Sequence, residues 1–341
     1  MIGVIAAAVA ALGYGVAPVC ARRAIRLLGF VRANLWRLVV AAAVLGTIAF
    51  ALGRGTGSEP LAFAVAGAIG FGVGGICMFR ALPLLGAPLA SLLVETGAAL
   101  AAAALAWTWF RDPIAPLTGV ACLVVLAGVA LGLAPYVRST TRTTARPART
   151  ERARTRRGVA YVLVAALAQA VAAVVSRWAL LAAQQADPVP PGPARNLAFV
   201  TSAAFDRLLG GVAVALLILL AARALSHRSA AADQALRRGG GFAPGTVPAR
   251  SELGRAGRVL PDTAWFWVGA NSFFGPVVGV TAMVWALQTL QPGVAQAIAA
   301  TAPLVAIPFA RWLEGYRPPP RYWAGALLAV GGLVALTLLG G

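Results

Sequence analysis

Long apolar segments separated by short polar stretches extend over the whole chain. Ten of them are long enough to cross a bilayer, which takes about 20 mostly apolar residues in a helix. They lie at roughly 2–21, 33–53, 61–81, 86–108, 114–136, 158–183, 202–224, 264–287, 292–313 and 322–340. Because the hydrocarbon interior offers no water to the backbone, spans of this length must be helical. With 60% hydrophobic residues in 341, the chain is predicted to be an all-α membrane protein with ten transmembrane helices.

The second half of the chain repeats the first. Residues 3–24 aligned with 158–179 agree at eleven of 22 positions, and residues 70–96 aligned with 275–301 agree at nine of 27. Identical Gly, Met, Thr and Arg residues in the same order carry more weight than aliphatic matches, which arise easily by chance in such a chain. A repeat with five spans re-enters the membrane the other way up. We therefore expect two inverted five-helix repeats.

The two repeats are predicted at 1–136 and 158–341, joined by an Arg-rich linker at 137–157. Eight arginines and one acid in the linker leave it unable to bury a core. Two insertions, at 184–198 and 226–262, explain why the second repeat is longer. Both lie between predicted spans, where extra length costs little free energy.

Charge in this chain is a signal of membrane topology. The formal net charge is +19, and all 29 basic residues are Arg; in a soluble protein this excess would suggest nucleic acid as a partner. Here 23 of the 29 lie in loops on one side of the helices, and three lie in the opposite loops. The Arg-rich loops are 22–32, 80–85, 138–157, 223–262 and 311–321. The positive-inside rule places this side in the cytoplasm and both termini outside.

Glu95 is the only acid deep inside a predicted span. A charged carboxylate at the bilayer centre costs at least about 2.5 kcal/mol, so an acid there is a functional candidate. It would bind a cationic solute or take up a coupling proton; the alternative is a neutral carboxyl group bonded to a neighbouring helix. Other polar residues in or near the spans either face a central cavity or hold helices together. These are Tyr14, Gln169, Asn271, Ser272, Gln288, Gln296 and Thr301.

Four prolines are expected to interrupt helices: Pro88, Pro276, Pro303 and Pro308. Each would remove a backbone hydrogen bond, and carbonyl groups freed near the midplane can hold a solute or ion; simple kinks are the alternative. Pro303, beside Thr301, is the best candidate because the family resemblance described below includes it.

Arg37 and Arg207 occupy equivalent positions in the two repeats. Each is expected to start a helix and to extend its charge toward the membrane surface as an interfacial anchor. The glycines between Gly67 and Gly75 are expected to bring the third helix close to a partner.

Catalytic chemistry finds little support in the residues. The single histidine, His227, lies in a long loop, and Cys20, Cys77 and Cys122 are isolated inside spans. A phosphate-binding P-loop needs Lys, which the sequence lacks. We therefore expect no enzyme activity, no cofactor and no metal site.

The order of motifs in both halves resembles the EamA-type ten-helix transporters of the drug/metabolite transporter superfamily. In the first half the matching residues are Tyr14-Gly15, Arg37, Gly67 to Gly75, Ala81-Leu82 and Gly119 to Gly128. In the second half they are Arg207, Gly275 to Gly279, Ala286-Leu287, Thr301-Ala302-Pro303, Leu313-Glu314-Gly315 and Gly325 to Gly332. The chain departs from the family pattern at Phe110 to Pro113, where the family has Gly-Glu, and at Glu95, in a helix that is usually uncharged.

The resemblance implies secondary transport, commonly export, of a small metabolite or drug-like solute. Alternating access would come from one repeat rocking against the other, around a solute site near the midplane. The candidate binding residues are Tyr14, Glu95, Gln169, Asn271, Gln296, Thr301 and Pro303. The expected partners are the solute and the lipids of the inner or plasma membrane, with a homodimer left open and nucleic acid not expected. A non-transporting scaffold that recruits partners through the Arg-rich loops, and a lipid-carrier flippase, remain the alternatives.

Thiol labelling of intact cells tests the orientation that the arginines predict. In a variant without native cysteines, a membrane-impermeant thiol reagent should label Gly341→Cys and leave Ser139→Cys unlabelled. Permeabilised cells, in which both positions should react, are the control. Labelling of Ser139→Cys alone from outside would place the Arg-rich loops outside and overturn the orientation.

Overall fold

The computed structural model describes residues 1–52, 54–111, 115–142, 149–186, 193–238, 262–314 and 320–339, and every regular element in these ranges is helical. The first half holds α1 (Ile2–Leu28), α2 (Phe30–Ala51), α3 (Pro60–Gly67), η1 (Ala68–Gly74), α4 (Gly75–Leu85), α5 (Ala87–Phe110) and α6 (Pro116–Arg142). The second half holds α7 (Arg149–Ala186), α8 (Pro193–Arg238), α9 (Asp262–Ser272), η3 (Phe273–Val280), α10 (Thr281–Leu287), α11 (Pro292–Ala299), α12 (Ala302–Glu314) and α13 (Pro320–Leu339).

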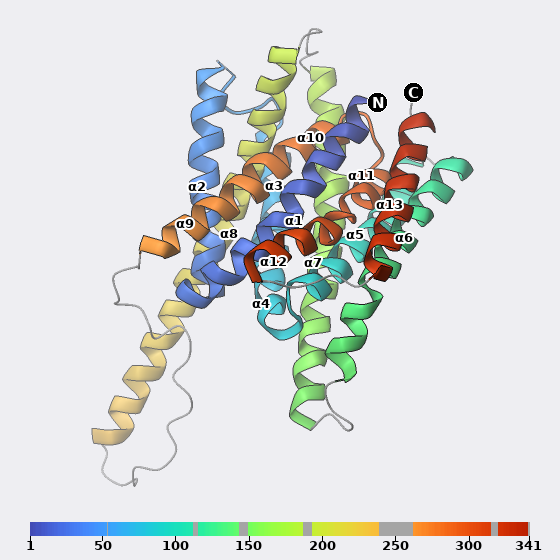
Figure 1. Cartoon of the computed structure of the whole chain (residues 1–341). Helices are drawn as coiled ribbons and strands as arrows, with labels where there is room; N and C mark the ends of the chain where they lie inside the picture. Colours follow the sequence, from blue (N-terminus) through green and yellow to red (C-terminus); the bar gives the residue numbers. More distant parts are fainter. Residues whose placement is uncertain are drawn as a thin grey trace.

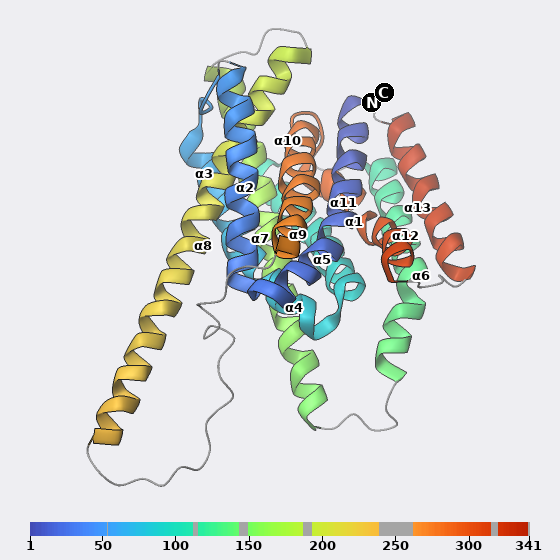
Figure 2. The same ribbon diagram turned by 60° about the vertical axis from the view of Figure 1, so that its left-hand side comes forward.

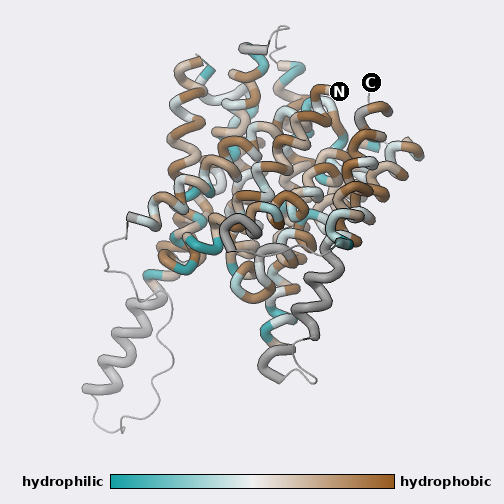
Figure 3. The backbone as a smooth tube through the Cα atoms, viewed as in Figure 1, coloured by the Kyte–Doolittle hydropathy of each residue, from teal (hydrophilic) through white to brown (hydrophobic). Residues whose placement is uncertain are grey.

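Each of the ten predicted spans corresponds to an apolar helical segment. Eight are long and apolar enough to cross a membrane, and the other two contain shorter apolar helices at Pro116–Gly132 and Pro320–Leu336. Figure 3 shows apolar residues spread over the helices, with hydrophilic stretches toward the lower ends of α1 and α7. The predicted fold class, an all-α membrane protein, is confirmed.

The helices of the two repeats run in opposite directions. In Figure 1, α1 starts at the top of the molecule and descends, whereas α7 starts at the bottom and rises. The start of α1 and the end of α13 lie at the same end in both views (Figures 1 and 2). The ends of α6 and α7 that flank the Arg-rich linker lie at the opposite end.

The third and eighth spans each contain a stretch of π-helix, which the sequence analysis did not predict. The stretches η1 and η3 begin at Ala68 and Phe273, which are 205 positions apart, the same offset that aligns the repeats there. Pro276 lies inside η3 and donates no backbone hydrogen bond. In η1, three of the seven residues are glycines without a side chain: Gly70, Gly72 and Gly74. A π-helical turn inside an α-helix is frequent at functional sites.

The ninth span is broken into α11 and α12, with Ala300 and Thr301 between them. Pro303 is therefore the second residue of α12, and Pro88 is the second residue of α5. In the first turn of a helix the missing N–H has no intrahelical partner to lose. The prediction that these two prolines remove a helical hydrogen bond is wrong, whereas Pro276 and Pro308 do lie inside helices.

The two repeats are interleaved. Helix α1 packs mainly against α9, η3, α10, α11 and α12 of the second repeat, and α7 packs mainly against α3, η1, α4 and α5 of the first. Packing of α1 on α2, α4 and α5 of its own repeat is much sparser. We call these two groups the α1 bundle (α1, α9, η3, α10, α11 and α12) and the α7 bundle (α7, α3, η1, α4 and α5). The pairs α2–α8 and α6–α13 also join one repeat to the other.

Two glycines allow α3 and α8 to meet backbone to backbone. A Cβ atom at Gly67 would overlap the carbonyl oxygen of Arg207, and one at Gly210 would overlap the carbonyl oxygen of Ala64. Any larger residue at either position would push the helices apart. The contact thus fixes α8 against the α7 bundle at the turn that carries Arg207.

The substitution Gly67→Ala tests this contact. We expect it to destabilise the protein by about 1–3 kcal/mol, the usual cost of overpacking. The matched control is Gly331→Ala in α13, where an added Cβ meets nothing within 4 Å and Ala improves helix propensity. Thermal unfolding of the full-length protein in detergent would measure both, and equal midpoints for the two variants would contradict the close approach.

Candidate functional site

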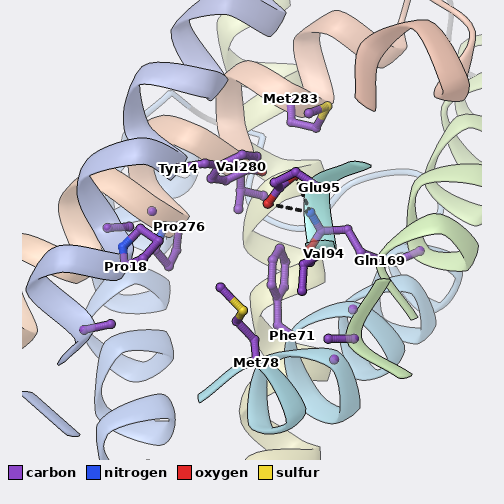
Figure 4. Close-up of a pocket in the computed structure, with 18 of the residues that line it drawn as sticks. Tyr14, Pro18, Phe71, Met78, Val94, Glu95, Gln169, Pro276, Val280 and Met283 are labelled. Carbon is purple, nitrogen blue, oxygen red and sulfur yellow. Dashed lines mark hydrogen bonds between the residues drawn. The ribbon is translucent and has the colours of Figure 1, made fainter. Parts of the chain in front are cut away.

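A cavity of about 100 Å³ lies between the α1 bundle and the α7 bundle. Figure 4 shows it with Glu95 and Tyr14 pointing inward from different helices. Seven of its described lining residues are polar or charged: Tyr14, Arg37, Glu95, Gln169, Arg207, Asn271 and Gln296. The rest of its wall is apolar and includes Pro18, Phe71, Met78, Val94 and Pro276. Five of the predicted binding residues therefore share one cavity.

Glu95 on α5 is paired with Gln169 on α7. The Gln169 Nε2 donates to both carboxylate oxygens, at 3.3 and 3.1 Å (Figure 4), and Glu95 is only 7% exposed. This bond joins a helix of the first repeat to one of the second. A carboxylate has about four acceptor positions. The Gln169 amide group therefore fills only part of the hydrogen-bonding capacity of Glu95.

Tyr14 occupies the position in α1 that Gln169 occupies in α7. Its ring lies against Gly279 of η3, where a Cβ would collide with the ring carbons. Tyr14 lines the cavity together with Arg207, Glu95 and Arg37. It therefore contributes an aromatic hydroxyl group to the cavity from α1.

Arg37 and Arg207 were expected at the membrane surface, and that prediction is wrong. Arg37 is the eighth residue of α2 and Arg207 the fifteenth of α8, so both lie well inside helices and line the cavity. Arg207 is 5% exposed, and its guanidinium carbon lies 5.1 Å from the centroid of the Phe71 ring. Close packing of α8 on Gly67 holds it there. The signal available in the sequence was their equivalent placement in the two repeats.

Asn34 holds the Arg37 guanidinium in place. The Asn34 Oδ1 accepts a hydrogen bond of 3.0 Å from Arg37 Nε, and its Nδ2 donates to the Phe71 carbonyl in η1 at 3.3 Å. The Arg37 guanidinium carbon also lies 4.6 Å from the centroid of the Phe79 ring. Arg37 is thus oriented from α2, η1 and α4 together.

Asn271 on α9 and Gln296 on α11 bring unsatisfied polar atoms to the cavity. They are 1% and 3% exposed. Neither amide atom of Asn271, nor Oε1 of Gln296, has a hydrogen-bond partner in the described part of the chain. A buried polar group without a partner costs about 1–3 kcal/mol. A bound ligand that made hydrogen bonds to these atoms would offset this cost.

The structure does not bring Thr301 and Pro303 to this cavity. The Thr301 hydroxyl donates to the Ile298 carbonyl at 2.8 Å, because Thr301 lies at the break after α11. Thr301 lines a second pocket, which is apolar, has a volume of about 760 Å³ and lies between α1, α12 and α13. Pro303 is buried at the start of α12 and is not part of either wall.

Metal ligands are not grouped in this fold as far as it is described. No set of three His, Cys, Asp or Glu residues within the described ranges could hold a metal ion.

The helices and the cavity between them define an integral, multi-pass membrane protein with polar groups at its centre. Its sequence matches the EamA-like transporter family over residues 1–133 and 240–338, well over half of the chain. The chain belongs to the EamA-like transporter family, whose members are transporters rather than enzymes. The resemblance predicted from the sequence motifs is confirmed.

Comparison with solved structures supports the fold alone. A structure described as "Crystal structure of protein" aligns over 99% of this chain and 97% of its own, with a TM-score of 0.64 and 17% sequence identity. No curated protein matches the sequence.

Proposed function

We propose that this protein is a secondary transporter that exports a small solute by alternating access, with the solute bound in the central cavity. The main support for this proposal is that seven polar or charged side chains from both repeats line one cavity. Ionisable groups within membrane spans are costly and mark solute or ion pathways. We place the Arg-rich loops in the cytoplasm by the positive-inside rule, and we take export as the direction from the family resemblance.

The bodies that move are the α1 bundle and the α7 bundle rather than the two halves of the sequence. Tyr14, Asn271 and Gln296 belong to the α1 bundle, and Glu95 and Gln169 belong to the α7 bundle. Separation of the bundles would therefore divide the cavity and release its contents. The π-helical stretches and the break between α11 and α12 are the proposed hinges, because their backbone bonding is the least regular in the described helices.

Glu95 is the proposed coupling group. Its carboxyl group can take up a proton and faces both the cavity and Gln169 across the α5–α7 contact. A proton on Glu95 would convert an acceptor of the Gln169 bond into a donor toward the cavity. Solute binding and proton uptake would then act on the same small set of bonds.

Two alternatives fit the structure less well. A membrane scaffold would bury its polar groups in pairs, whereas Arg207, Asn271 and Gln296 retain atoms without partners among the described residues. A lipid-carrier flippase would need basic residues beside a lateral apolar opening. The large apolar pocket between α1, α12 and α13 has no arginine among its described lining residues.

Filling the cavity should stop transport. Met78 on α4 lines the cavity, and Met78→Trp adds bulk there; Leu123→Trp in α6 is the matched control because Leu123 is 61% exposed and lies outside the cavity and the proposed hinges. Full-length protein in proteoliposomes would be given concentration jumps of small carboxylates, ammonium ions, zwitterions and amides, and currents recorded on solid-supported membranes. We expect a response from wild type and Leu123→Trp, reduced at least tenfold in Met78→Trp. Full activity in Met78→Trp, or no response of wild type to any solute, would overturn the proposal.

The substitution Glu95→Gln tests proton coupling. Gln keeps the shape of Glu and an acceptor for Gln169 but cannot titrate. We expect normal expression, with transport either lost or independent of pH between about 5 and 9, where wild type varies. Glu59→Gln, in the loop before α3, changes the same charge outside the cavity and should behave as wild type. Unaltered pH dependence in Glu95→Gln would remove Glu95 from the coupling step.

A further inference from the structure

The charged groups of the cavity do not balance. Arg37 and Arg207 contribute two positive charges, and Glu95 is the single carboxylate among the described lining residues. Nearby Asp206 does not line the cavity; its Oδ2 accepts a hydrogen bond of 2.8 Å from the Gly57 N–H in the α2–α3 loop. The surplus is one positive charge with Glu95 ionised and two with Glu95 protonated. Charges interact strongly where water is excluded. The excess positive charge therefore favours the binding of an anion in the cavity.

Arg207 has hydrogen-bonding capacity that the protein does not use. Its Nε and Nη1 are buried, and neither has a partner in the described part of the chain. The side chain cannot withdraw toward the membrane surface, because its backbone is packed on Gly67 and its guanidinium on Phe71. A planar guanidinium with free N–H groups is suited to bind an oxyanion.

Arg37 and Asn271 present further donors around a space kept open by glycine. A Cβ atom at Gly275 would lie 3.9 Å from Arg37 Nη1 and 3.8 Å from Asn271 Oδ1, and one at Gly75 would lie 3.1 Å from Arg37 Nη2. Neither amide atom of Asn271 has a partner among the described residues. These atoms therefore border a common space, and Arg207 lines the same cavity.

We propose that the transported solute is a small organic monoanion whose carboxylate group binds to Arg207, Arg37 and Asn271. This inference rests on the proposed transport function and specifies its substrate class. A single negative charge matches the surplus that the cavity has when Glu95 is ionised. The apolar part of the solute would lie against Phe71, Met78 and Pro276.

Solutes with the same type of apolar part and a different polar end group test this assignment. Purified full-length protein would be titrated with butanoate, butanamide and butylammonium, and with benzoate, benzamide and benzylammonium, and thermal unfolding followed by intrinsic tryptophan fluorescence. We expect a carboxylate in at least one series to stabilise the protein at concentrations at least tenfold below those of the matching amide and ammonium ion. A preference for the ammonium ion or amide, or no shift with any carboxylate, would overturn it.

Charge-matched variants locate the effect. Arg207→Gln and Arg37→Gln should each weaken carboxylate binding at least tenfold, and Arg207→Lys should also weaken it because the planar fork is lost. Arg22→Gln removes an equal charge from the exposed end of α1 and should change binding less than twofold. Asn271→Ala, which leaves every charge in place, should weaken binding severalfold and serves if an arginine variant fails to fold. Equal binding in all variants would overturn the assignment.

The transport currents separate this inference from the function on which it rests. If ammonium or neutral solutes are transported and Met78→Trp stops them, the cavity is a transport site and the carboxylate assignment alone is wrong. If no solute of any charge binds or produces a current, the transport proposal fails together with the assignment.

Discussion

The exclusion of water from the bilayer interior is the constraint on which the structure depends. It makes the backbone helical and makes each polar side chain within a span expensive. The protein meets this cost by gathering such side chains at one place, where Glu95 is paired with Gln169 and Arg37 with Asn34. The unpaired atoms of Arg207 and Asn271 lie in the same place. These unpaired atoms carry a desolvation cost that the paired groups avoid.

Interleaving of the repeats places the site between helices that come from both halves of the sequence. Because α1 packs with the later helices of the second repeat and α7 with those of the first, every wall of the cavity is shared between the two halves of the sequence. The α2–α8 pair contributes both arginines, and Gly67 and Gly210 hold α8 against α3. Arg207 thus lies on a helix that is held by a backbone-to-backbone contact, whereas the hydrogen-bonded pair Glu95 and Gln169 lies on α5 and α7.

The sequence predicted the helices well because hydropathy and length are enough to define a span. Glu95 could also be found from sequence, since an acid among apolar residues stands out. Arg37 and Arg207 were misplaced because each was taken as an interfacial anchor near the start of its helix; α8 begins at Pro193, fourteen residues before Arg207. Thr301 was grouped with the cavity because it is a polar residue within a predicted span, and the sequence does not show which helices it faces. Which helix packs on which depends on contacts between distant segments, and hydropathy carries no information about those.

Interleaving also imposes an order on biosynthesis. Helix α1 leaves the ribosome first, but the helices on which it packs, α9 to α12, begin about 260 residues later. During that interval its polar Tyr14 and its small-residue faces have only lipid and early neighbours as surroundings. Neither repeat can reach its final form as a separate polypeptide, because each lacks the helix that the other supplies. The protein therefore matures as one unit, and the last helices to be made complete the packing of the first.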